Sequence, residues 1–120
     1  MRVRALRGAV TTDTDSKDEI VEATTELLEE ILDRNDVGTD DVVFIIFTAT
    51  KDLTAEFPAA AVRKLGLSHI PVICARELDV EGALPRTIRT MMLINTDKAR
   101  EQLRHVYLRE ARQLRTDLPE

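Results

Sequence analysis

Two arginines of this chain lie in short apolar segments of the kind that form buried strands. Arg7 lies in one such segment near the N-terminus, and Arg89 lies in another. Between them, a third apolar segment carries Cys74, the only cysteine, and is followed by Glu77. A charged side chain is costly to bury unless it is paired or meets an anionic ligand. Because arginine can grip a carboxylate with two parallel hydrogen bonds, the pattern predicts a site for a small carboxylate-bearing molecule.

Each of these residues also has a plainer explanation. Arg7 taken alone is typical of a structural arginine in an ion pair, and Glu77 is its obvious partner. Cys74 taken alone is typical of an inert core residue. Tyr107 is typical of half-buried packing, and His105 of a structural histidine. Residue types alone therefore leave both interpretations open.

Length and composition exclude several classes of protein. The 120 residues suit one domain, residues 1–120, and the apolar fraction of 43% is typical of a folded chain. A net charge of -5 and an aromatic fraction of 3% argue against a nucleic-acid partner. A single cysteine excludes an internal disulfide and favours a reducing, cytoplasmic setting. No apolar stretch approaches ~18 residues, so we expect no membrane span. The N-terminal run carries Arg2, Arg4 and Arg7 and has no apolar core segment, so we expect no secretory signal.

Hydrophobic periodicity divides the chain into strands and helices. We expect strands at residues 2–10, 42–48, 70–75, 86–95 and 104–108, and helices at 17–34 and 57–65. Ser16 and Glu19 form a capping box at the start of the first helix. The continuous apolar run of 42–48 indicates a strand buried on both faces. From about residue 112 the sequence leaves open a helix or a loose, mobile tail.

The order of these elements predicts a fold of the α+β class. Connections through helices favour parallel neighbours, and short connections favour antiparallel ones, so a mixed sheet of about five strands follows. Both helices would cover one face of it. A chain this short has little left to cover the other face, so we expect it to associate with copies of itself.

Short motifs follow one another in a distinctive order from about Arg4 to Leu118. They are Arg4–Ala9 (Arg-Ala-Leu-Arg-Gly-Ala), Phe57–Ala59, Ala61–Arg63, the Cys74–Glu77 spacing, Ile88–Arg89 and Arg104–Leu108 (Arg-His-Val-Tyr-Leu). In their joint order and spacing, the chain resembles the monofunctional chorismate mutases of the small trimeric type, the AroH class.

The resemblance implies a reaction and an assembly. The reaction is the Claisen rearrangement of chorismate to prephenate, on the route to phenylalanine and tyrosine, with no cofactor, no metal and no covalent intermediate. The assembly is a homotrimer, a pseudo-α/β-barrel with its active sites in clefts between subunits. Chorismate and prephenate are therefore the expected ligands.

The resemblance also implies roles for individual residues. Arg89 would lie at the ether oxygen of chorismate, where negative charge develops as the C–O bond breaks. Arg7 would grip the side-chain carboxylate, and Tyr107 would donate its hydroxyl to the same group. Glu77 would accept a hydrogen bond from the ring hydroxyl, with Cys74 nearby, and would also balance the ring's partial positive charge and orient Arg89.

The other expected substrate contacts form the walls and the mouth of the site. They are the apolar wall of Phe57 and Ala59, Ile73, Arg63 near the mouth, and Leu114 and Arg115 over the entrance. One position departs from the family pattern, because Ala60 stands where members often have lysine. That departure argues against a side-chain role at this position, but not against the reaction.

Two other functions fit parts of the sequence. A non-catalytic trimeric module that binds a small anionic metabolite would share the arginines and the architecture. A cysteine hydrolase would use Cys74 with His69 or His105, which requires a base within hydrogen-bond reach of the thiol. No local motif favours the hydrolase.

Overall fold

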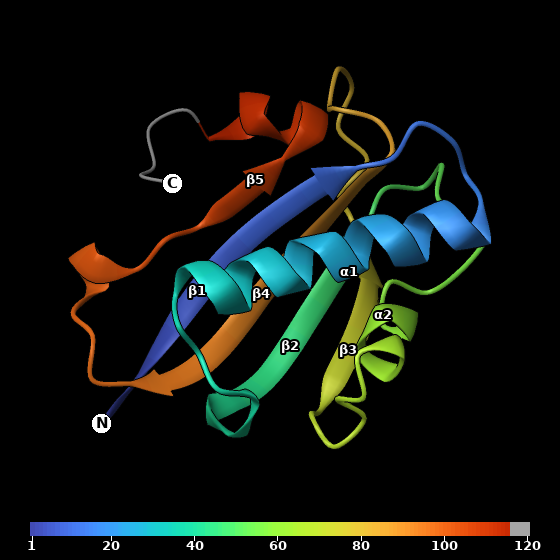
Figure 1. Cartoon of the computed structure of the whole chain (residues 1–120). Coiled ribbons are helices and arrows are strands. Elements are labelled where there is room, and N and C mark those ends of the chain that lie inside the picture. The colour runs from blue at the N-terminus through green and yellow to red at the C-terminus, as the bar shows by residue number, and fades with distance from the viewer. Residues whose placement is uncertain (116–120) are drawn as a thin grey trace.

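The computed structural model describes residues 1–115, which form a five-stranded sheet in the order β3-β2-β4-β1-β5 (Figure 1). The elements are β1 (Arg2–Thr11), α1 (Lys17–Arg34), η1 (Thr39–Asp41), β2 (Val42–Ala49), α2 (Ala60–Lys64), β3 (Val72–Arg76), β4 (Thr87–Thr96), η2 (Arg100–Gln102), β5 (Val106–Leu108) and η3 (Arg109–Leu114), where η denotes a short 3-10 helix. Part of the C-terminal segment that the sequence leaves open, residues 116–120, lies outside the described residues.

The sheet is mixed, which confirms the α+β prediction. β4 pairs antiparallel with both β1 and β2, whereas β1 with β5 and β2 with β3 pair parallel. The connection through α2 joins parallel neighbours, as expected. The short connections join strands of opposite direction, but these strands are not neighbours, because β2 separates β3 from β4 and β1 separates β4 from β5.

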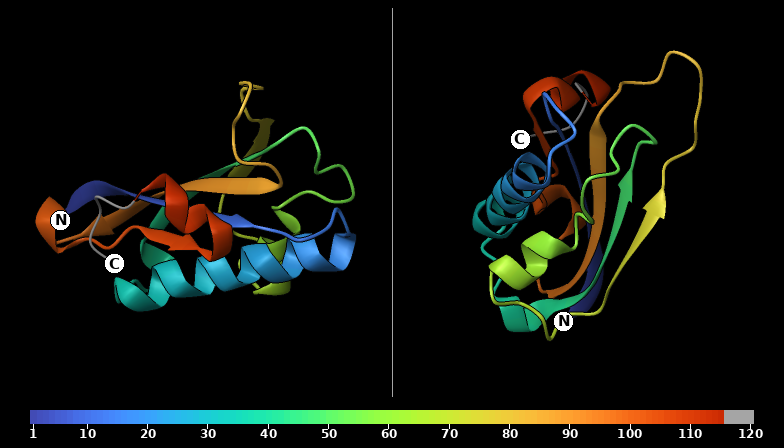
Figure 2. Two further views of the ribbon diagram at one scale, coloured as in Figure 1. Left: turned by 90° about the horizontal axis from the view of Figure 1, so that it is seen from above. Right: turned by 90° about the vertical axis from the view of Figure 1, so that its right-hand side faces the viewer.

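Both helices lie on the same face of the sheet (Figure 2). α1 packs there through one apolar side, whose members Ile20, Ala23, Leu27, Leu28 and Ile31 are fully buried. Its N-terminus is capped by Ser16, whose hydroxyl accepts the Glu19 N–H at 3.2 Å. The second half of the predicted capping box is wrong, because the Glu19 carboxylate bonds to Asp13 and Thr14 instead.

The other face of the sheet is uncovered in the chain by itself. In β2, Ile45 and Phe47 face the helices and are 1% and 0% exposed, whereas Phe44 and Ile46 point the other way and are only half-buried. The prediction of a strand buried on both faces is therefore wrong for the isolated chain. The same uncovered face carries Ile73, which is 62% exposed.

The second helix is shorter than predicted. α2 begins at Ala60 rather than at Phe57, because tighter turns precede it. The N–H groups of Ala60 and Ala61 donate to the carbonyls of Phe57 and Pro58, three residues back. The predicted stop is confirmed, since Gly66 has a φ of 75° just after the helix.

Gly8 lies where β1 passes closest to β5 and α1. A Cβ atom at this position would lie 2.9 Å from the Val106 carbonyl oxygen and 3.0 Å from Ile31 Cδ1. We expect Gly8→Ala to lower the free energy of unfolding by about 1–3 kcal/mol, the usual effect of overpacking a close contact. Denaturant titration followed by circular dichroism measures this difference.

Gly38→Ala is the matched control for that substitution. A Cβ at Gly38 would meet only Asp41 Oδ2, at 3.8 Å, and its φ of -75° suits any residue. This variant should match or slightly exceed the parent in stability, because alanine reduces the freedom of the unfolded chain. A Gly8→Ala protein as stable as the control would contradict the close packing.

Candidate active site

A hollow of about 250 Å³ lies on the uncovered face of the sheet. This Arg89 hollow is lined by Arg7, Gly8, Ile46, Thr48, Glu77, Arg89, Thr90, Met91 and Tyr107. Four of the residues that the sequence singles out, Arg7, Glu77, Arg89 and Tyr107, thus share one hollow although 100 positions separate the first from the last.

Strand register explains why these side chains meet. Thr48 on β2 lies opposite Arg89 on β4, Arg89 lies opposite Ala9 on β1, and Ala9 lies opposite Tyr107 on β5. Because side chains of paired positions point to the same side of a sheet, this row faces away from the helices. Strands β1, β2, β4 and β5 therefore fix the positions of Arg7, Thr48, Arg89 and Tyr107, and Glu77 joins them from just beyond the end of β3.

Arg89 and Glu77 form an ion pair at the centre of the hollow. Arg89 Nε lies 3.2 Å from Glu77 Oε2, although this buried N–H is not aligned to donate a hydrogen bond. The same carboxylate oxygen accepts a hydrogen bond from Thr48 Oγ1 at 2.6 Å. The Arg89 side chain is still 43% exposed, so its terminal nitrogens remain accessible to a ligand.

Arg7 is the second cation of the hollow and is half-buried. Its backbone N–H donates to His105 Nδ1 at 2.9 Å. The plainer explanation of Arg7, an ion pair with Glu77, is wrong, because Glu77 pairs with Arg89 and the Arg7 guanidinium has no ion-pair partner among residues 1–115. Two guanidinium groups against one carboxylate give the hollow an excess of positive charge, which suits an anionic ligand.

Tyr107, which belongs to β5, forms one side of the hollow. The residue is only 7% exposed. Its ring packs in a small apolar cluster with Ala9, Ala111 and Leu114. Leu114 ends η3 and Arg115 follows it, but neither of these two predicted contacts lines the Arg89 hollow. Leu114 packs beside Tyr107.

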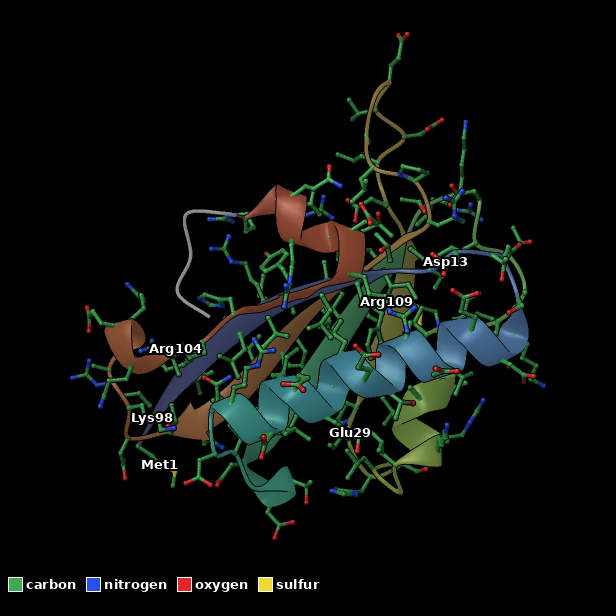
Figure 3. All side chains as sticks on the ribbon, turned by 45° about the horizontal axis from the view of Figure 1, so that its top comes forward. Met1, Asp13, Glu29, Lys98, Arg104 and Arg109 are labelled. Atoms are coloured by element: carbon green, nitrogen blue, oxygen red, sulfur yellow. The ribbon has the colours of Figure 1, made fainter. Side chains whose placement is uncertain are left out.

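Arg109 holds the turn between Tyr107 and η3 against α1 (Figure 3). Its backbone is left-handed, with a φ of 55°, a conformation that costs free energy outside glycine. Its guanidinium lies 3.3 Å from Glu26 Oε2 and 3.7 Å from Glu19 Oε1, and it donates to the Thr11 carbonyl at 3.2 Å. These contacts compensate for the strained backbone and fix the start of η3.

The remaining predicted site residues lie elsewhere. A separate Cys74 hollow of about 440 Å³ is lined by Ala49, Leu53, Thr54, Ala55, Glu56, Phe57, Pro58, Cys74, Ala75 and Arg76. Phe57 is 67% exposed there, and Arg63 is exposed on α2. Ile73 and Ala59 line neither hollow. Within one chain the predicted site is thus divided into two parts.

The environment of Cys74 argues against a cysteine hydrolase. Burial raises the pKa of its thiol, and a hydrogen bond with the Ala59 backbone only partly offsets this. His69 is exposed on a loop, and His105 Nδ1 already accepts the Arg7 N–H. In the part of the chain that the structure describes, neither histidine is bonded to the thiol, so the required nucleophile–base pair is missing.

Among residues 1–115, no three side chains of the His, Cys, Asp and Glu types come together in a way that could hold a metal ion. None of the helices in this range combines the length and apolar character needed to cross a bilayer.

The chain matches a known protein family over nearly its whole length. A family model described as chorismate mutase type I matches residues 3–118. The chain belongs to this family. The resemblance inferred from the sequence motifs is confirmed, and with it the assignment to a class of isomerases.

Individual members of the family are similar over almost their full length. The chorismate mutase AroH of Thermus thermophilus is 47% identical over 117 residues, which are 97% of this chain and 96% of that protein. The chorismate mutase AroH of Bacillus subtilis (strain 168) is 46% identical over 119 residues, 98% of this chain and 94% of that protein. A solved chorismate mutase from Clostridium thermocellum superimposes with a TM-score of 0.91 at 45% identity, covering 92% of this chain and 98% of that one.

Sequence reasoning on this type I chorismate mutase missed several residues of the Arg89 hollow. They are Gly8, Ile46, Thr48, Thr90 and Met91. Thr48 was detectable, because it is the first polar residue after the apolar run of β2 and alternates in direction with the buried Phe47. Ile46 and Met91 gave no signal, because an apolar side chain in a strand is normally assigned to the core.

Proposed function

We propose that this chain converts chorismate to prephenate in the Arg89 hollow, as a step in phenylalanine and tyrosine biosynthesis. The observation that carries the proposal is a pair of guanidinium groups on rigid strands, one beside Glu77 and the other without an ion-pair partner among the described residues. Chorismate carries two carboxylates, a hydroxyl and an enol ether, so two cations and one carboxylate match its functional groups.

The reaction sets two physical tasks. It is unimolecular, so the enzyme must first hold the folded conformer in which the two carbon ends can meet, which requires fixed donors. It must then stabilise the negative charge that develops on the ether oxygen as the C–O bond breaks ahead of C–C bond formation. Neither task needs proton transfer or a nucleophile.

Arg89 performs the electrostatic task in this proposal. Its terminal nitrogens donate to the ether oxygen, while its Nε stays beside Glu77. The Thr48 hydroxyl holds Glu77 from the other side, at 2.6 Å. Glu77 therefore orients Arg89, accepts a hydrogen bond from the ring hydroxyl of chorismate and balances the partial positive charge of that ring.

Arg7 and Tyr107 perform the positioning task. The guanidinium of Arg7, which has no ion-pair partner within residues 1–115, binds the side-chain carboxylate, and the Tyr107 hydroxyl donates to the same group. Tyr107 is held by its packing against Ala111 and Leu114. Through this packing Leu114 would affect binding although it does not line the hollow, and Arg115, the next residue, would act at the entrance.

A homotrimer completes the site in this proposal. The uncovered face of the sheet supports it, because Ile73, Ile46 and Met91 lie side by side there and water would wet them in a monomer. Residues of the neighbouring subunit would then close the Arg89 hollow. They are Phe57, Ala59, Arg63, Ile73 and Cys74, the predicted contacts that lie outside this hollow within one chain.

Mixing two inactive variants tests whether the site is shared. Arg89→Ala removes the ether-oxygen donor, and Phe57→Asp disrupts the wall that a neighbour would supply. The two proteins are mixed in equal amounts, unfolded and refolded together. We expect about a quarter of the sites to be intact, because a site needs an unchanged Arg89 from one subunit and an unchanged Phe57 from its neighbour, each with a chance of about one half. A mixture as inactive as its components would contradict a site between subunits.

A chorismate-depletion assay on the purified protein tests the function itself. Loss of the ultraviolet absorbance of chorismate, with prephenate identified as product, is the expected result. Binding of chorismate without loss of absorbance would instead favour the non-catalytic binding module. The cytoplasmic location expected from the single cysteine stays a prediction.

A further inference from the structure

His105 lies immediately before β5 and bonds to the backbone of Arg7. Its Nδ1 accepts the Arg7 N–H at 2.9 Å, a contact between residues 98 positions apart in the sequence. The β1–β5 ladder includes only Gly8, Ala9 and Val10 of β1, so Arg7 lies one residue beyond its end. The imidazole therefore takes the place of the backbone carbonyl that a longer β5 would offer.

This hydrogen bond fixes the protonation state of the imidazole. An Nδ1 that accepts an N–H must be unprotonated, so the neutral ring carries its proton on Nε2. A doubly protonated imidazolium has no acceptor and cannot make the bond. Protonation of His105 would thus leave the Arg7 N–H without a partner and place a positive charge beside Arg7.

The surroundings of His105 disfavour that protonation. The ring borders a hollow of about 410 Å³ with Val3, Arg4, Ala5, Arg7, Met91, Leu93, Arg100 and Leu103. Every charged group in this lining is an arginine, from β1 or η2, and Arg115 approaches from the end of η3. Burial lowers the pKa of His105 from its ordinary value of 6.5, and the charges of Arg7 and Arg115 lower it further.

We propose that His105 is a positioning residue for the reaction, one that holds the backbone of Arg7 so that its guanidinium stays fixed in the Arg89 hollow. This inference rests on the proposed function, in which Arg7 grips a carboxylate of the substrate. His105 does not touch the substrate, because it does not line the Arg89 hollow. Its effect on catalysis passes through one backbone hydrogen bond.

The inference predicts an acid limb in the pH profile. The native state holds His105 neutral, so the hydrogen bond is intact above pH 6.5. It is lost as the pH falls through the lowered pKa that His105 has in the folded protein. We expect kcat/KM to fall in this acidic window, with KM rising more than kcat falls. The free energy of unfolding should decline as the pH falls from 6.5 to that lowered pKa, because in this range the unfolded chain binds the proton more readily.

Two substitutions of His105 separate positioning from mere packing. His105→Ala removes the acceptor and should lower kcat/KM roughly tenfold at neutral pH, the factor expected when a donor loses its acceptor. His105→Asn places an amide oxygen near the position of Nδ1, cannot be protonated, and should restore most of the activity with no acid limb. His69→Ala is the matched control, because this other histidine is exposed and precedes β3, which β2 and β4 separate from the strand of Arg7.

A second measurement does not depend on turnover. The backbone N–H of Arg7 should exchange with deuterium faster in His105→Ala than in the parent, and at the parent rate in His105→Asn. An unchanged KM and exchange rate in His105→Ala, or an acid limb that persists in His105→Asn, would overturn the inference. Failure of the parent to consume chorismate would instead reject the proposed function, and the exchange rates would still test the hydrogen bond.

Discussion

Arg89→Ala should lower kcat at least ~10²-fold, the loss typical of removing one preorganised donor to a developing negative charge. The guanidinium contributes little to the ground state, because the ether oxygen of chorismate is a weak acceptor before its bond begins to break. The effect should therefore fall on kcat more than on KM. Stopped-flow or steady-state measurement of chorismate loss checks this split.

Two further variants define what Arg89 does. Arg89→Lys keeps the charge but loses the planar fork beside Glu77, so it should recover only part of the rate. Arg2→Ala is a control for net charge, since Arg2 is exposed at the far end of the same sheet. Both variants should be folded, as judged by circular dichroism.

The ion pair with Glu77 allows a sharper test. If Arg89 only neutralised Glu77, the double variant Arg89→Ala with Glu77→Gln would regain near-parent turnover, because the carboxylate that needs neutralising would be gone. In the proposed role the double variant stays as slow as Arg89→Ala or slower. Recovery of turnover would reduce Arg89 to a structural partner.

Arg7→Ala should lower kcat/KM roughly 10- to 100-fold, the range for losing a hydrogen-bonded contact to a charged group. The loss should appear mainly in KM, because Arg7 grips a carboxylate that is ionised in both the ground state and the transition state. The Arg7 side chain has no ion-pair partner within residues 1–115, so truncation leaves no carboxylate of the described chain unpaired. The variant should consequently lose little stability.

Arg100→Ala is the matched control for Arg7. It removes a positive charge from the hollow next to Arg7, but Arg100 is exposed and lies outside the Arg89 hollow. Direct contact predicts a large effect for Arg7→Ala and a small, salt-dependent one for Arg100→Ala. Equal effects from both variants would mean that Arg7 contributes only to the general field.

The sequence by itself determined the local elements and the chemistry available to them. The apolar runs around Leu6, Ile45 and Met92 predicted three strands, and the polar turn with Ser16 predicted the start of α1. These predictions depend on neighbours a few residues away, so a single segment contains the information. Family motifs spread along the chain supplied the rest of the assignment.

Only the tertiary structure decided which of these groups meet. It paired Glu77 with Arg89 rather than with Arg7, left one face of β2 uncovered, and divided the predicted contacts between two hollows. It also placed His105 against the backbone of Arg7. Such contacts depend on strand order and register. These are set by the free energy of the whole chain, so the spacing of residues within one segment does not encode them.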